Sequence, residues 1–164
     1  MGDVAVRPVA VGDGDAIWAI LEPVFRAGDT YTVDPDISRE DALAYWLGPL
    51  HRVYLAGEGL GTYYIRPNQG GGGDHVCNCG YLTAAEAQGK GVARAMLAHS
   101  LDEARRLGFR AMQYNFVVET NTRAIDIWTR AGFDTVGRLP GAFRHPEFGF
   151  VDALILYKDL TKET

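Results

Sequence analysis

Hydrophobic residues in the first part of the chain follow the two spacings that distinguish strands from helices. Residues 4–9 alternate between apolar and polar types and predict a strand. Apolar residues over 17–25 fall on one stripe at helical spacing and predict a helix that begins after Asp13 or Asp15. Residues 38–47 predict a second, shorter helix because they open with capping residues ahead of an apolar run. The chain therefore begins with a strand and two helices.

The rest of the chain continues this alternation, with turn residues at each boundary. The predicted elements are a hairpin of 51–58 and 61–68, a strand at 75–83, a helix from 92 to 107, a strand at 111–118, a helix within 120–133, and a closing strand pair at 135–139 and 151–158. This order predicts a three-layer α/β fold, with a mixed, mostly antiparallel central sheet and helices on both faces. We expect one domain over residues 1–164, a length at which about two-thirds of the unfolded surface is buried.

Composition narrows the functional classes. The formal net charge of −5 argues against a nucleic-acid-binding protein that relies on a broad basic surface. No uninterrupted apolar stretch reaches the length that spans a membrane. The first residues lack a basic start followed by an apolar run, so a secretory signal is not expected and the cytoplasm is the expected compartment.

His75, Cys77 and Cys79 form a short motif that suggests a metal site. On a strand these side chains share one face, with about 6.6 Å between successive positions. Zinc ligands lie about 2.0–2.3 Å from the ion, so this spacing is too wide for one metal. We therefore expect no metal here, and two buried cysteines that act as small apolar residues.

The segment 86–98 combines a glycine-containing loop with the start of an amphipathic helix. The N-terminus of a helix attracts phosphate because its first N–H groups lack partners and its dipole is positive there. Lys90 and Arg94 add positive charge. The spacing fits neither a P-loop, since Gly91 follows Lys90, nor a dinucleotide fingerprint, since Arg94 stands where the third glycine belongs. Two interpretations of the loop remain: it binds the phosphate of another cofactor, or it binds no ligand.

Two blocks of the chain resemble the motifs of the GNAT superfamily of N-acetyltransferases. Gln88-x-x-Gly91-x-Ala93 resembles the acetyl-coenzyme A motif, and Asn121-x-x-Ala124-x-x-x-Trp128 resembles the helix that follows it. With the opening strand and helix, the resemblance extends over essentially the whole chain. It implies that acetyl-CoA is the cofactor, and that its contacts are Leu82, Thr83, Gln88, Gly89, Lys90, Gly91, Val92, Ala93, Arg94, Asn121, Ala124 and Trp128.

The same resemblance implies how the reaction proceeds. An amine attacks the acetyl thioester directly, and a free strand N–H, which we expect from Leu82, stabilises the oxyanion. The family often has a tyrosine where this chain has Trp128, and an indole N–H is not an acid near neutral pH, so we assign no general acid. Glu119 and His145 are candidate bases, and Asn115 is expected beside them at the reaction centre.

Asn78 and Asn115 interrupt stretches that otherwise favour strands, although asparagine is disfavoured in strands. A buried amide needs partners, which either a substrate or a neighbouring backbone group supplies. The surrounding segments also resemble GNAT enzymes that acetylate proline-like imino acids, in which these asparagines bind substrate. Residues 27–42 resemble the acceptor-side segment of the phosphinothricin and amino-acid acetyltransferases. This implies that Asp29, Thr30 and Tyr31 line the substrate pocket, together with His145.

The resulting hypothesis is an acetyl-CoA-dependent N-acetyltransferase that acts on a small amino or imino acid. A protein N-terminal or lysine acetyltransferase is the alternative within the same class. A non-catalytic acyl-CoA sensor is an alternative of another class, suggested by the missing tyrosine. The family's habit and the closing strands suggest a homodimer, with no nucleic-acid or membrane partner.

Overall fold

The computed structural model describes residues 3–162, and its elements follow the predicted order. They are β1 (Val6–Pro8), α1 (Gly14–Ala27), α2 (Arg39–Trp46), β2 (Arg52–Ala56), β3 (Gly61–Pro67), β4 (Val76–Thr83), α3 (Val92–Arg106), β5 (Ala111–Val118), α4 (Thr122–Arg130), β6 (Asp134–His145) and β7 (Gly149–Asp159). Two short 3₁₀ turns, η1 (Gly71–Gly73) and η2 (Ala85–Ala87), precede β4 and α3. The sequence pattern therefore predicted every helix and strand, though not every boundary.

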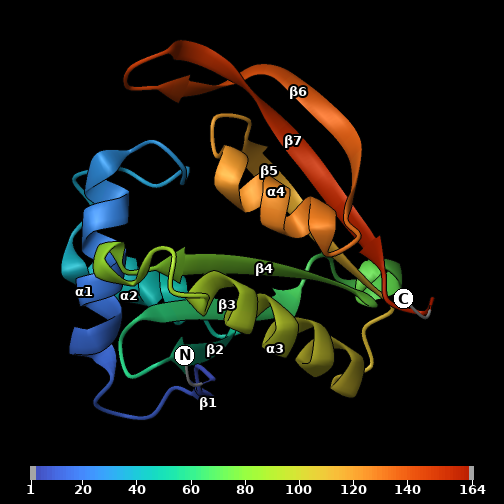
Figure 1. Cartoon of the computed structure of the whole chain (residues 1–164), viewed down its shortest axis with the longest axis horizontal. Helices are drawn as coiled ribbons and strands as arrows, with labels where there is room; N and C mark the ends of the chain where they lie inside the picture. Colours follow the sequence, from blue (N-terminus) through green and yellow to red (C-terminus); the bar gives the residue numbers. More distant parts are fainter. Residues whose placement is uncertain (1–2, 163–164) are drawn as a thin grey trace.

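All seven strands form one sheet in the order β1-β2-β3-β4-β5-β7-β6. Neighbouring strands are antiparallel except β4 and β5, which are parallel. These two strands pair only at Val76–Ala111 and Cys77–Met112 and then separate. Figure 1 shows them diverging from their shared end. The sheet is thus open in its centre, between two strands that remain anchored to their other neighbours.

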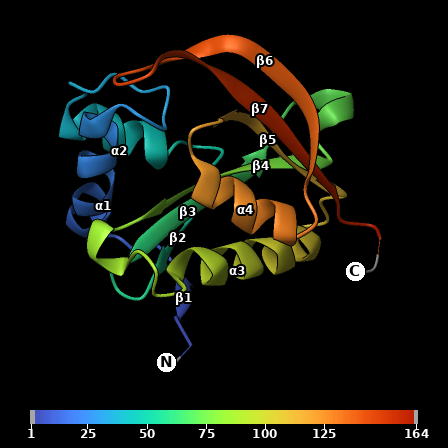
Figure 2. The ribbon, with the colours of Figure 1, turned by 45° about the horizontal axis from the view of Figure 1, so that its top comes forward.

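The helices form the two outer layers of the expected fold. Trp46 of α2 donates from its indole N–H to Thr62 and packs on Tyr64, so α1 and α2 cover the face on which the even-numbered residues of β3 lie. His99 of α3 contacts Tyr63 on the opposite face. Trp128 of α4 lies on that same face, and Figure 2 shows α3 and α4 next to each other there. No helix within residues 3–162 is long and apolar enough to cross a membrane.

Local signals set most element ends. Ser38 caps α2 by accepting from the N–H of Asp41 at 3.0 Å, as the sequence predicted. Asp13 stands at the N-cap of α1 but makes no capping bond, because its carboxylate is paired with Arg7 and accepts from the N–H of Ala10. Gly108, at φ +86°, follows the end of α3 in the left-handed region that favours glycine.

The closing strands are longer than predicted. β6 runs through Pro140 and Gly141, beyond the predicted end at residue 139, and its pairing with β7 shifts register between Leu139 and Phe143. This irregularity accommodates the two residues without ending the strand. The two strands form an arm that extends beyond the body of the sheet (Figure 1).

Candidate active site

The loop before α3 presents backbone N–H groups that have no partner among residues 3–162. Gly89 and Gly91 have φ values of +78° and +82°, which favour glycine. Within residues 3–162, no protein group accepts from the N–H of either glycine, and the first helical bond of α3 runs from Ala95 to Gly91. The N–H groups of the first helical turn, residues 92–94, are therefore also free. A Cβ atom placed on Gly91 would meet nothing within 4 Å, so this backbone is open to a ligand.

Three cations surround these free N–H groups. Lys90 and Arg94 are exposed in and beside the loop. Arg123, at the start of α4, has a guanidinium nitrogen 3.5 Å from the position that a Cβ atom of Gly89 would take. None of the three forms an ion pair with a residue in 3–162. Free amides and uncompensated positive charge together suit a pyrophosphate.

The N-terminus of α4 lies on the other side of the opening. Asn121 stands at the N-cap of α4, yet its side chain makes no capping bond, so the amide is free to contact a ligand. Two turns further on, half-buried Trp128 lies with its ring centroid 6.2 Å from that of Tyr81 on β4 and 4.7 Å from that of Tyr114 on β5. Trp128 therefore covers the split between the two strands from the side of α3 and α4.

The register of β3 and β4 decides which backbone groups line the split. Thr62 pairs with Leu82, and the N–H of Ala84 donates to Leu60 at 2.8 Å, so the even-numbered residues of β4 direct their N–H groups to β3. The N–H of Leu82 consequently points away from the split and does not fit the expected role of oxyanion donor. By the alternation of a strand, the N–H groups of Tyr81 and Thr83 point into the split.

Tyr31 connects the α1–α2 loop to the same place. Its hydroxyl donates to the carbonyl of Tyr81 at 3.2 Å, and burial raises the pKa of this hydroxyl well above 10, so it stays protonated. Gly80 makes this approach possible, since a Cβ there would lie 2.5 Å from the ring of Tyr64 and 3.0 Å from the hydroxyl of Tyr31. Asp29 and Thr30 are half-buried in the same loop.

Asn78 and Asn115 lie on the face of the sheet that α1 and α2 cover. The Asn78 side chain donates to the carbonyl of Gln113 at 3.0 Å, which continues the contact between β4 and β5 one step beyond the ladder. Asn115 accepts from the Gln113 side chain at 3.0 Å and donates to the Asn68 side chain at 2.7 Å. For Asn78 the backbone partner considered from the sequence is therefore present, and for Asn115 the partners are side chains.

Glu119 is not a free carboxylate. One oxygen accepts from Arg138 at 2.9 Å and the other from the backbone N–H of Asp152 at 3.1 Å. Arg138 also binds Asp152, so the three residues form one cluster between β5, β6 and β7. Both carboxylate oxygens therefore already have partners, and this arrangement does not favour the predicted role of Glu119 as the base.

His145 lies in the arm, where β6 ends. Its Nδ1 atom accepts from the N–H groups of Glu147 and Phe148 at 3.1 and 3.2 Å, and its ring stacks on Phe148. In the neutral ring the proton therefore lies on Nε2, which leaves no lone pair for taking a proton from an amine. A role as base is not favoured, although the Nε2–H group can donate to a substrate.

The cysteine motif packs as small apolar residues. Cys77 and Cys79 are free thiols, 0% and 7% exposed, whereas His75 is exposed. Within residues 3–162 no group of three potential ligands is arranged to hold a metal ion.

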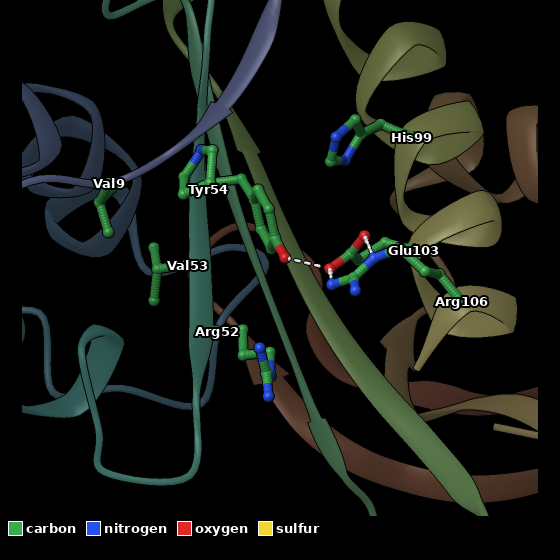
Figure 3. Close-up of a pocket in the computed structure, with 8 residues that line it drawn as sticks. Val9, Arg52, Val53, Tyr54, His99, Glu103 and Arg106 are labelled. Atoms are coloured by element: carbon green, nitrogen blue, oxygen red, sulfur yellow. Dashed lines mark hydrogen bonds and ion pairs between the residues drawn. The ribbon is translucent and has the colours of Figure 1, made fainter. Parts of the chain in front are cut away.

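A separate open depression of about 430 Å³ lies at the edge of the sheet, away from the split. Figure 3 shows it between β2 and α3, where the Tyr54 hydroxyl donates to Glu103 at 2.6 Å and Glu103 also binds Arg106. Arg106 lowers the pKa of Glu103 to about 2. These polar groups bind one another across the packing of α3 on β2, so we assign the depression to the structural framework.

Sequence reasoning missed several residues of the split. Arg66 and Gln113 each face the same side of the sheet as Asn78, and Arg123 faces the phosphate loop. For Arg66 a signal existed, since in residues 61–67 it follows Thr62 and Tyr64 at every second position, on the covered face. For Gln113 no pattern in the sequence indicated where β4 and β5 separate.

Comparison with known proteins agrees with this geometry. Residues 15–133 match the model of the acetyltransferase (GNAT) family. The N-acetyltransferase aca1 of Schizosaccharomyces pombe is 37% identical over 97 residues, which are 58% of this chain and 46% of that protein. The chain thus spans about half the length of this curated relative.

Solved structures share the fold over nearly the whole chain. A GCN5-related N-acetyltransferase from Kribbella flavida has a TM-score of 0.90 and 38% identity, covering 96% of this chain and 98% of that one. A GNAT phosphinothricin acetyltransferase from Sinorhizobium meliloti, solved in complex with acetyl-CoA, has a TM-score of 0.82 and 17% identity, covering 96% and 89%. The free loop amides, the split sheet and the family match agree, and the chain belongs to the GNAT family of acetyltransferases, with acetyl-CoA as its cofactor.

Proposed function

We propose that the chain is a cytoplasmic N-acetyltransferase that moves the acetyl group of acetyl-CoA to the amine of a small amino or imino acid. The observation that carries the proposal is the split between β4 and β5, which has free N–H groups and uncompensated cations at its mouth. The residues for the pyrophosphate are the loop and first helical turn, Gln88–Arg94, helped by Arg123. Thr83, Asn121, Ala124 and Trp128 lie along the path from there into the split.

When bound, acetyl-CoA supplies an acetyl thioester, which the acceptor amine attacks. Because the pyrophosphate loop follows the C-terminal end of β4, Thr83 is nearer the mouth and Tyr81 is deeper. We therefore move the role of oxyanion donor from Leu82 to the N–H of Tyr81, whose direction into the split suits it. Tyr31 holds the carbonyl of the same residue and so fixes the orientation of that N–H. A thiol leaves as thiolate without a general acid, since its pKa of about 8.5 is close to neutral.

The acceptor side favours a small molecule over a protein segment. Tyr31 from the α1–α2 loop reaches the backbone of β4, and the side chains of Asn68 and Asn115 bind each other on the same face. These contacts connect the α1–α2 loop, β4 and β5 on the acceptor face, which supports a small acceptor. An acetyltransferase that acts on protein N-termini or lysines requires instead an open groove for an extended peptide.

An acceptor screen tests the proposal. Purified protein with acetyl-CoA and a thiol reagent should release coenzyme A steadily with amino acids or cyclic imino acids, and mass spectrometry should detect the acetylated acceptor. Peptides and polyamines, offered at the same concentration, should be poor acceptors. Turnover with peptides alone would favour the protein acetyltransferase. Cofactor binding without turnover of any amine would favour the non-catalytic sensor.

A further inference from the structure

Arg66 is a cation without a counter-ion on the acceptor face of the sheet. It is half-buried near the end of β3, and its Nε atom is shielded from solvent with no hydrogen-bond partner. Its guanidinium forms no hydrogen bond or ion pair with any residue in 3–162. A buried, unpaired donor is costly, and buried charges are usually paired, so this environment is incomplete without a further acceptor.

The neighbours of Arg66 do not neutralise it. Tyr64 lies two residues earlier on the same face, and the ring of His51 stacks on that of Tyr64 at 4.1 Å. Since the backbone carbonyl of Trp46 bonds to Nδ1 of His51 at 2.8 Å, this nitrogen carries the proton. Burial lowers the pKa of His51, with a smaller contribution from Arg66, and so favours the neutral ring. Neither of these two aromatic residues brings a negative charge to the guanidinium.

Register places Arg66 beside the split. Arg66 pairs with Asn78 across β3 and β4, and Asn78 binds Gln113 of β5, so the three residues form a row over the point where the strands separate. Within residues 3–162 the amide oxygen of Asn78 has no hydrogen-bond donor, while its amide nitrogen is used. The row thus offers a guanidinium next to a free amide oxygen, three residues along β4 from Tyr81.

We propose that Arg66 binds the carboxylate of the acceptor, so that the enzyme selects anionic amino or imino acids over amides and simple amines. The proposal rests on the proposed function and adds the residue that sets its specificity. A guanidinium pairs well with a carboxylate, and the free oxygen of Asn78 suits the N–H of the acceptor amine. An amino acid brings both groups, separated by one carbon atom, to neighbouring positions of the row.

Matched acceptors test this directly. L-proline and L-prolinamide differ in the carboxylate alone, and so do L-methionine and L-methioninamide. The amides have the less basic amines, so intrinsic reactivity near neutral pH favours them. We expect the wild-type protein to prefer the acids in kcat/KM nevertheless. The Arg66→Met variant should lose about 10- to 100-fold in kcat/KM for the acids, mainly through KM, and little for the amides. Arg66→Lys should keep part of the preference because it keeps the charge.

Arg52→Met is the matched control. Arg52 is an exposed arginine on the adjacent strand β2, where it lines the depression beside α3 on the other face. Its replacement should leave the acid-to-amide ratio unchanged. Thermal unfolding and acetyl-CoA titration of each variant separate a folding defect from a loss of specificity. Equal kcat/KM for acids and amides in the wild type, or a preference that survives in Arg66→Met, would overturn the proposal.

A binding measurement keeps the test independent of turnover. The Arg66 Nε–H signal in a ¹⁵N NMR spectrum, assigned by its loss in Arg66→Lys, should shift on titration with N-acetyl-L-proline in the presence of coenzyme A. N-acetyl-L-prolinamide should leave it in place. If no amine releases thiol but this signal responds to the acid alone, the proposed function fails and carboxylate binding stands. If thiol is released but the Arg66 signal does not shift with the acid, the proposed role of Arg66 is wrong and the proposed function stands.

Discussion

Asn78 shows how one residue serves both the fold and the site. Its amide nitrogen donates to the carbonyl of Gln113 at the point where β4 and β5 separate. Its amide oxygen is left for a ligand on the acceptor side. Asparagine is disfavoured in strands because its amide must find partners there. The sequence therefore identified an unusual position, but it left open whether a backbone group or a substrate was the partner. In the structure the amide nitrogen has a backbone partner, and the amide oxygen has no donor among residues 3–162.

Replacing Asn78 by alanine separates these two contributions. The carbonyl of Gln113 loses its donor, which should lower the free energy of unfolding by about 1–3 kcal/mol in a urea titration. The lost oxygen should also raise KM for the best acceptor. If stability falls while KM for that acceptor is unchanged, Asn78 is a structural residue and its substrate role is wrong.

Single residues also show which properties the sequence can predict and which it cannot. Buried Cys77 and Cys79 followed from spacing alone, because alternation on a strand fixes which side chains share a face. Alternation also fixes the direction of each N–H, but which neighbour it meets depends on register. The direction of the Leu82 N–H, which does not fit its expected role, is thus a property that only the pairing of β3 and β4 reveals.

At the level of elements, the loop and the start of α3 form a unit that depends on backbone geometry. Gly91 adopts a left-handed conformation, and the space around its Cβ position is open. Alanine there would not collide with any atom, but its backbone strain would cost about 1–2 kcal/mol. Gly108, at φ +86° with equally open space, follows the other end of the same helix and is a matched control. The order of elements and this loop could be predicted, because periodicity and glycine spacing are local signals.

The opening of the sheet could not be predicted from the residues. Both β4 and β5 are apolar enough for a fully paired central strand, and nothing in their periodicity states where pairing ends. The position of the opening depends on the pairing of β4 with β3 and of β5 with β7. These pairings join segments that lie apart in the sequence. Resemblance to a family implied a free strand N–H, and the register of two residue pairs gives the location of the split that frees it.

At the scale of the whole molecule, the arm of β6 and β7 carries three exposed large apolar side chains. Val136, Phe148 and Phe150 are 60%, 61% and 75% exposed there. Exposed apolar side chains of this size favour association, and we propose that the arm joins two copies of the chain. Sedimentation should give twice the monomer mass of 17.9 kDa. Replacing both Phe148 and Phe150 by serine should reduce the sedimenting species to the monomer.

Leu50, which is 67% exposed outside the arm, provides the control substitution for this test. Leu50→Ser should sediment as the wild type does. A wild-type protein that sediments as a monomer at micromolar concentration would contradict the proposed dimer, and the site within one chain would be unaffected.

The central claim is that the mouth of the split binds acetyl-CoA through the free amides of the loop and of α3. Calorimetric titration of the purified protein with acetyl-CoA tests it most directly. The wild type and Gly108→Ala should bind with the same affinity. In Gly91→Ala the free loop can relieve its strain, so binding must restore the left-handed geometry at a cost of ~1.4 kcal/mol and should be about tenfold weaker. Absence of binding to the wild type at millimolar acetyl-CoA, or equal affinity in Gly91→Ala, would contradict this account.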